Sequence, residues 1–190
     1  MWISHLDLAH TLQRAFSRAG YRIGYSEGFN PHPLMSIALP LSVGTESVCE
    51  ILDVKMEEMP EKSNLNAVLP EGIEILDIYE QETKASEIKW LEVEGFLSPS
   101  RSEWKDLFDR DSVVINKKTK SGFSDVDIKP MIKKISYNDD GFRALVSAQN
   151  PTLNPQSIAD AIAQLMPSAA PETAKFKRLE IYDADMKEFR

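Results

Sequence analysis

The stretch "SHLDLAHTLQRAFSRAG", residues 4–20, has the complete pattern of one amphipathic helix. Ser4 stands at the N-cap position with Asp7 three residues later, and Gly20 provides the stop at the far end. At 100° per residue the apolar and charged side chains separate onto opposite sides. The side that we expect to pack comprises Leu8, Leu12, Ala15, Phe16 and Ala19. One side of this helix therefore packs, and the other carries charge.

The segments that follow the helix alternate between strand and helix patterns. The predicted strands are "YRIGY" (21–25), "LMSIALPLSV" (34–43), "SVCEILDVKM" (47–56) and "GIEILDIYE" (72–80), and "EKSNLNAVLP" (61–70) predicts a short helix. The order helix, strand, strand, helix, strand is that of a ferredoxin-like βαββαβ unit without its first strand. We therefore expect a first ferredoxin-like domain over residues 1–82.

The second half repeats this order. Strands are predicted at 88–97, 112–119, 141–149 and 174–185, and helices at 100–111 and 154–166. Pro130 is expected to break or bend the segment 124–139, and "NDDG" is a hairpin signal. The polar stretch 81–87 is the expected boundary between the two domains. The sequence thus predicts an α+β protein with two ferredoxin-like sandwiches in tandem, the second over residues 83–190.

Composition limits the function. The chain has 190 residues and a net charge of −8, which argues against loose electrostatic binding to nucleic acid. Residues 1–40 differ, because three arginines and all three histidines fall there against Asp7 and Glu27. No window is apolar enough to span a membrane and the start lacks a signal peptide pattern, so we expect a cytoplasmic protein without membrane contact.

The loop "YSEGFNPHP", residues 25–33, contains more special chemistry than a turn requires, since one or two glycine, proline or asparagine residues suffice for a turn. Together with the charged side of the first helix it predicts one composite ligand-binding site. The candidate residues are His5, Asp7, His10, Arg14, Arg18, Tyr25, Ser26, Glu27, Phe29, Asn30 and His32. The arginines suit phosphate or carboxylate groups, and the rings suit stacking on bases.

Several stretches together carry a family resemblance. "ISHLDLAHTLQRAFSRAGYRIGYSEGFNPHPLMSIALPLSVGTES" (3–47), "LNAVLPEGIEIL" and "NKKTKSGFSDVDIKP" resemble the radical SAM-linked protein family, a bacterial domain of unknown function. The resemblance implies a cobalamin-binding radical SAM protein as the partner, encoded beside or fused to this domain. It also implies a basic strand before the Ser-His-Leu-Asp motif, so we expect the first strand of the first sandwich to be missing here.

Catalysis by the chain itself has little support in the sequence. A radical SAM cluster needs three thiolates, and this chain has one cysteine, so the iron–sulfur cluster, S-adenosylmethionine and cobalamin are expected only in the partner. His5 and His10 are turned about 140° apart on a helix, which prevents joint metal ligation. His32 with Asp7 or Glu27 remains conceivable as a ligand set, but we predict no metal site.

We therefore predict a non-catalytic binding module that presents RNA or another anionic substrate to a radical SAM partner. One alternative is a small enzyme that uses His32 and Glu27 as acid and base, with or without a metal. The other alternative is a structural adaptor between proteins.

Overall fold

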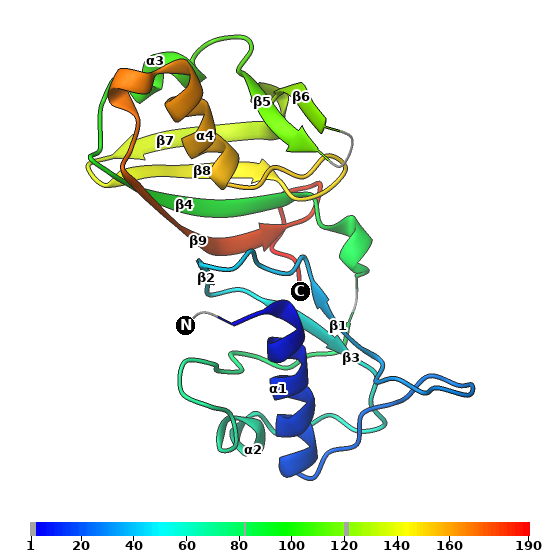
Figure 1. Ribbon diagram of the computed structural model, residues 1–190. Helices are drawn as coiled ribbons and strands as arrows, with labels where there is room; N and C mark the ends of the chain where they lie inside the picture. The colour runs from blue at the N-terminus through cyan, green and yellow to red at the C-terminus, as the bar shows by residue number, and fades with distance from the viewer. Residues whose placement is uncertain (1–2, 82, 120–121) are drawn as a thin grey trace. The chain divides into compact units, whose positions relative to one another are not determined.

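The computed structural model describes residues 3–81, 83–119 and 122–190 and divides into two compact units (Figure 1). Unit 1 comprises Met1–Gly44, Glu50–Ala85 and Arg190, and unit 2 comprises Thr45–Cys49 and Ser86–Phe189. Compared with the predicted division at 82/83, unit 2 also takes a short segment from the first half of the chain. The mixed α+β class predicted from the sequence is confirmed.

Unit 1 contains two α-helices and a two-stranded antiparallel sheet. Its elements are α1 (His5–Arg18), β1 (Met35–Ala38), β3 (Ile51–Val54) and α2 (Lys62–Asn66), and the 3₁₀ turn η1 (Ala85–Glu87) follows at its end. The predicted features of α1 are confirmed: Ser4 is the N-cap, Ala19 the C-cap, and Gly20 follows with a φ of 87°. Of the predicted packing side, Leu12, Ala15 and Phe16 are buried.

The first half departs from the predicted strands at two places. Residues 21–25 contribute only isolated bridges, from Ile23 to Met56 and from Tyr25 to Pro33. Residues 72–80 form no strand, although their pattern alternates. The reason is visible at Ile75, whose backbone N–H and C=O both bond the side chain of Asn66, at 2.8 and 3.0 Å. A side chain therefore takes the place of a neighbouring strand at this residue.

Unit 2 is built on a five-stranded sheet in the order β2-β9-β4-β8-β7. The strands are β2 (Thr45–Ser47), β4 (Trp90–Ser98), β7 (Ile132–Asn138), β8 (Gly141–Ser147) and β9 (Thr173–Tyr182). The helices are α3 (Trp104–Phe108) and α4 (Gln156–Leu165), with 3₁₀ turns η2 (Lys129–Met131) and η3 (Pro167–Ala169). A separate hairpin pairs β5 (Val114–Thr119) with β6 (Gly122–Asp127). The β2–β9 pairing is parallel, and the other neighbours in the sheet are antiparallel.

Unit 2 runs through β4, α3, β7, β8, α4 and β9 in a βαββαβ order, but its second strand is not the predicted one. The predicted strand 112–119 is β5, which lies outside the five-stranded sheet, and β7 comes from the segment 124–139. The β5–β6 hairpin is inserted between α3 and β7, and β2 extends the sheet at the β9 edge. Pro130 lies in η2 between β6 and β7, as expected for a residue that cannot continue a strand ladder. A tandem of two ferredoxin-like sandwiches stays a prediction, since the sheet of unit 1 has two strands.

The core of unit 2 lies between the sheet and α3 and α4 (Figure 1). Alternate residues of β4 are buried, and Trp104, Phe108 and Phe142 are the largest fully buried side chains. Trp104 satisfies its indole N–H by donating to the carbonyl oxygen of Ala169 at 2.9 Å. Gly95 is required beneath Phe142, because a Cβ there would lie 2.4 Å from the phenyl ring. Within the described residues, no helix has the length and apolar character needed to cross a membrane.

Candidate functional site

The segment 25–33 forms a tight hairpin, called here the 25–33 hairpin, that joins α1 to β1 in unit 1. Its base is fixed by the backbone: Gly24 donates to the carbonyl oxygen of Lys55 at 2.7 Å, and Leu34 donates to that of Gly24 at 2.7 Å. Glycine suits position 24, since a Cβ there would lie 3.1 Å from the Lys55 oxygen. The base of the hairpin is therefore held against the end of β3.

Ser26 and His32 close the hairpin across its width. The Ser26 amide donates to the His32 carbonyl oxygen at 2.9 Å, and the His32 amide donates to Ser26 Oγ at 3.0 Å. Ser26 Oγ and His32 Nδ1 also share a hydrogen bond of 2.8 Å. Two of these three bonds use the serine hydroxyl and the third joins the two backbones, so the pair orders the loop.

The tip of the hairpin presents an aromatic ring to solvent. Phe29 has the largest exposure among the exposed large apolar side chains, at 107% of the reference value, and Glu27 and Asn30 beside it are also exposed. Gly28 has a φ of 117°, a conformation that favours glycine and turns the chain before Phe29. In Figure 1 the blue hairpin between α1 and β1 extends away from the rest of unit 1. A phenylalanine in this position contributes nothing to the core.

One side of α1 lies next to the hairpin base. Gln13 Nε2 donates to the hydroxyl of Tyr25 at 3.2 Å, which links the middle of the helix to the first residue of the hairpin. His10 and Arg14 are exposed, three residues before and one after Gln13. Sequence analysis missed Gln13. The sequence feature that could have identified Gln13 is its spacing of three from His10, which places the two side chains on neighbouring positions of the helix surface.

Other predicted residues point to partners elsewhere in unit 1. Ser4 Oγ donates to Asp7 Oδ2 at 2.6 Å and accepts from the Asp7 amide at 3.2 Å, so Ser4 caps α1 and the Asp7 carboxylate orients its hydroxyl. The Arg18 guanidinium donates to the carbonyl oxygen of Val68 at 2.7 Å, just after α2. His5 is exposed in the first turn of α1. Gln13 thus links the hairpin to the side of α1 that carries His10. Asp7 bonds the N-cap of α1, and Arg18 bonds the backbone just after α2.

The chemistry open to this region is binding through rings and cations. In the part of the chain that the structure describes, no three His, Cys, Asp or Glu side chains lie close enough to hold a metal ion together. His32 and Glu27, the candidate acid and base, are exposed on the hairpin, and a Ser–His pair open to water lacks a group that excludes solvent. The exposed rings and cations of this region include Phe29, Tyr25, His5, His10 and Arg14.

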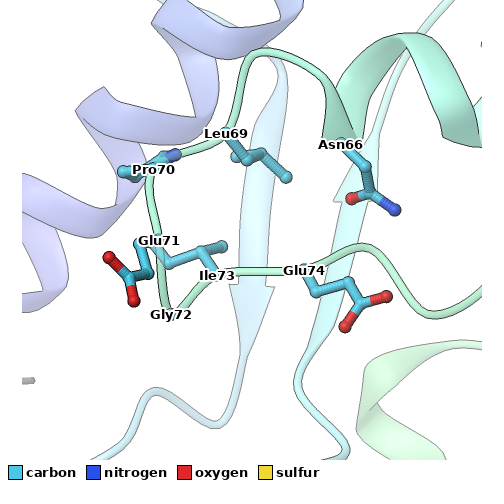
Figure 2. A pocket seen from close by; sticks show the side chains of 7 residues that line it. All are labelled: Asn66, Leu69, Pro70, Glu71, Gly72, Ile73 and Glu74. Carbon is cyan, nitrogen blue, oxygen red and sulfur yellow. The ribbon is translucent and has the colours of Figure 1, made fainter.

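A shallow depression of about 490 Å³ lies elsewhere in unit 1, in the loop after α2 (Figure 2). Its lining residues are Asn66, Leu69, Pro70, Glu71, Gly72, Ile73 and Glu74. Figure 2 shows the carboxylates of Glu71 and Glu74 pointing away from each other, with Leu69 and Ile73 between them. The Asn66 amide is already bonded to Ile75. The depression therefore lacks convergent polar groups that would recognise a ligand.

The fold and the site together define a two-unit α+β protein with a projecting aromatic hairpin. Residues 1–160 match the model of a family described as an uncharacterized protein conserved in bacteria (DUF2344). This match covers most of the chain, which therefore belongs to that bacterial family. Comparisons with curated proteins and with solved structures found no match.

Proposed function

We propose that the protein is a non-catalytic binding module that presents RNA, or a comparable anionic substrate, to a radical SAM partner. The observation that carries this proposal is Phe29, fully exposed at the tip of a hairpin whose own hydrogen bonds fix its shape. An ordered loop that holds an aromatic ring in water is suited to recognition, because the ring gains contact area at little further entropic cost.

The cationic side of α1 supports the same proposal. His10 and Arg14 are exposed on the helix that Gln13 ties to the hairpin. Arginine donates bidentate hydrogen bonds to phosphate, and single-stranded RNA is recognised by stacking on aromatic rings together with such cations. The hairpin and this side of α1 thus offer both kinds of contact within unit 1.

The partner is inferred from the resemblance of the Ser-His-Leu-Asp helix and the 25–33 hairpin to the radical SAM-linked family. In this proposal the iron–sulfur cluster, S-adenosylmethionine and cobalamin belong to the partner, and both proteins act in the cytoplasm. The proposal also takes each unit as a ferredoxin-like sandwich, although the sheet of unit 1 has two strands.

The test is binding of a fluorescein-labelled oligouridine, measured by fluorescence anisotropy at low salt. We expect Phe29→Ala to weaken binding about tenfold, the size typical of one lost base-stacking contact. Arg14→Ala should weaken binding and reduce its dependence on salt. Phe123→Ala is the matched control, since Phe123 is 73% exposed on the β5–β6 hairpin of unit 2. Equal affinities for wild type, Phe29→Ala and Arg14→Ala would contradict the proposal.

A further inference from the structure

The β5–β6 hairpin of unit 2 forms a sheet of its own, apart from the five-stranded sheet (Figure 1). Its two strands pair in a register without a bulge. Ile128 donates to the carbonyl oxygen of Val113 at 2.9 Å, and hydrogen-bonded pairs of an antiparallel hairpin recur at every second position from there. The backbone groups of Asn116 on β5, and of Phe123 and Asp125 on β6, therefore point away from the hairpin.

The edge of β5 is closed by side chains of α4. The Asn116 amide donates to Gln164 Oε1 at 2.8 Å, and Gln164 Nε2 donates to the Asn116 carbonyl oxygen at 3.1 Å. Lys117 Nζ donates to Ser157 Oγ of the same helix at 3.0 Å. The outward backbone groups of Asn116 thus have a partner, and β5 anchors the hairpin on α4.

The edge of β6 is open. Among the described strands, β6 pairs with β5 alone, and residues 122–125 are exposed. Within the described part of the chain, no group bonds the outward N–H and C=O of Phe123 and Asp125. The edge therefore offers two donors and two acceptors to another strand.

The edges of the five-stranded sheet are protected in ways that β6 is not. β7, at one edge, carries Lys133 and Lys134 together with a register shift beside them. β2, at the other edge, has three residues. Lysines, bulges and short strands keep an edge from pairing with other chains. β6 has six residues in regular register and contains no lysine or proline, so it remains able to accept a strand.

The side chains of β6 determine which strand fits. Phe123 and Asp125 lie on the same face, and Lys118 lies opposite Phe123 on the β5 side, away from the open edge. The Asn116 side chain donates to Asp125 Oδ1 at 2.8 Å, which uses one of about four acceptor positions of the carboxylate. Asp127 adds a second carboxylate to β6, which has no cation. A basic residue opposite Asp125 and an apolar residue opposite Phe123 would both gain cross-strand contacts.

A second copy of this chain fits the edge less well. The two registers in which two β6 strands overlap most have their two-fold axis at Ser124 or at Asp125. The first places Phe123 of each copy opposite Asp125 of the other, and the second places two Asp125 carboxylates opposite each other. The net charge of −8 also opposes self-association. A basic and apolar strand from a different protein is therefore favoured.

We propose that the open edge of β6 binds an extended segment of a partner protein as an additional antiparallel strand. In this segment a lysine or arginine lies opposite Asp125 and an apolar residue lies opposite Phe123. Main-chain hydrogen bonds hold a strand added in this way, and the side chains next to the edge select it. Because the strands are antiparallel, the basic residue comes two positions before the apolar one in the partner sequence. The inference concerns unit 2 alone and is independent of RNA binding by the 25–33 hairpin.

The experiment titrates the full chain into fluorescein-labelled Lys-Thr-Lys-Thr-Val-Thr and measures fluorescence anisotropy. A second peptide has glutamate in place of both lysines. We expect the wild type to bind the basic peptide about tenfold more tightly than the acidic one, and Asp125→Lys to reverse this preference. Asp139→Lys makes the same charge change in the exposed β7–β8 turn and should bind as wild type does. Phe123→Ala should weaken binding of the basic peptide and leave oligouridine binding unchanged.

Backbone methylation distinguishes strand addition from simple charge attraction. In the proposed register the valine N–H faces β6 and the N–H of the threonine before it faces away. We expect N-methylation of that valine to abolish binding and N-methylation of that threonine to preserve it. Slower exchange of the Phe123 and Asp125 amides in the complex, with unchanged exchange at Asn116, would support the assignment to β6. Equal binding of the two methylated peptides, equal effects of Asp125→Lys and Asp139→Lys, or absence of binding by the wild type would overturn the proposal.

Discussion

Asn66 is the residue on which the loop after α2 depends most. Its amide bonds both the N–H and the C=O of Ile75, and it is partly buried. We expect Asn66→Ala to destabilise unit 1 by about 1–3 kcal/mol, since two backbone groups lose their partner together. The measurement is thermal unfolding followed by circular dichroism. Asn64→Ala is the control, because it removes one exposed hydrogen bond to the Tyr21 hydroxyl and should cost less.

Asp127 makes the stability of unit 2 sensitive to acid. The amides of Val113 and Lys129 donate to its carboxylate, at 2.9 and 3.0 Å, and these bonds lower the pKa of Asp127. A carboxyl group whose pKa is lower in the folded state stabilises the fold above its unfolded pKa of about 4. That stability is lost as the pH falls through the lower, folded pKa.

Urea unfolding at a series of pH values tests this effect. We expect Asp127→Asn to lower the urea midpoint at neutral pH. As the pH falls, the urea midpoint of this variant should decrease less than that of the wild type. Asp139→Asn, an exposed carboxyl in the β7–β8 turn, is the control and should follow the wild-type profile. Parallel profiles for Asp127→Asn and wild type would show that the two amide contacts do not select the ionised carboxylate.

At the scale of elements, the 25–33 hairpin depends on one hydroxyl. Ser26→Ala removes the group that accepts from the His32 amide and bonds its ring. We expect faster amide hydrogen exchange at residues 27–32 with little change in global stability, because the hairpin contributes no buried side chain. Ser26→Thr keeps the hydroxyl and should exchange as wild type does. Unchanged exchange in Ser26→Ala would mean that the backbone bridge alone fixes the loop.

The turn between β7 and β8 depends on Gly141. A side chain there would meet the Gly95 oxygen at 2.0 Å, and the backbone has a φ of 150°. We expect Gly141→Ala to abolish folding of unit 2 or to destabilise it by more than about 3 kcal/mol. Gly122→Ala provides a matched comparison, since Gly122 has a φ of 127° and open space around its Cα. Equal losses of the denaturant midpoint in the two variants would assign the effect to backbone conformation alone.

The elements that sequence analysis predicted well are those set by local signals. The cap of α1 at Ser4, the stop at Gly20, the break at Pro130 and the two-residue turn before Gly141 all depend on residues within one turn of the chain. The prediction of a strand at 72–80 was wrong, because strand pairing depends on residues distant in the sequence. Its polar and apolar residues do alternate, but the Asn66 side chain bonds the backbone of Ile75, where a neighbouring strand would otherwise pair.

The candidate site shows the same division. The turn-rich sequence around Phe29 marks a loop, and in the structure Phe29 is exposed at its tip. The link from Gln13 to Tyr25 and the bond from Arg18 to Val68 join residues distant in sequence, so spacing alone does not reveal them.

At the scale of the whole molecule, the two units differ in how much apolar surface they bury. In the described part of unit 1 the buried apolar residues are Leu12, Ala15, Phe16, Ala38 and Leu65, and every other buried apolar residue belongs to unit 2. Burial of apolar area is the main term that stabilises a fold, so unit 1 should be the less stable of the two. Its two-stranded sheet also leaves fewer backbone hydrogen bonds to protect it.

Hydrogen exchange followed by mass spectrometry over increasing urea tests this difference within one intact chain. We expect α1 and the β1–β3 sheet to lose protection at lower urea than β4, β8 and β9, in two separate transitions. Leu65→Ala should shift only the first transition, because it opens a cavity in the small core of unit 1, whereas Ile162→Ala should shift only the second. A single transition that both variants shift equally would mean that the units unfold together, and the stability of the 25–33 hairpin would then depend on the sheet of unit 2.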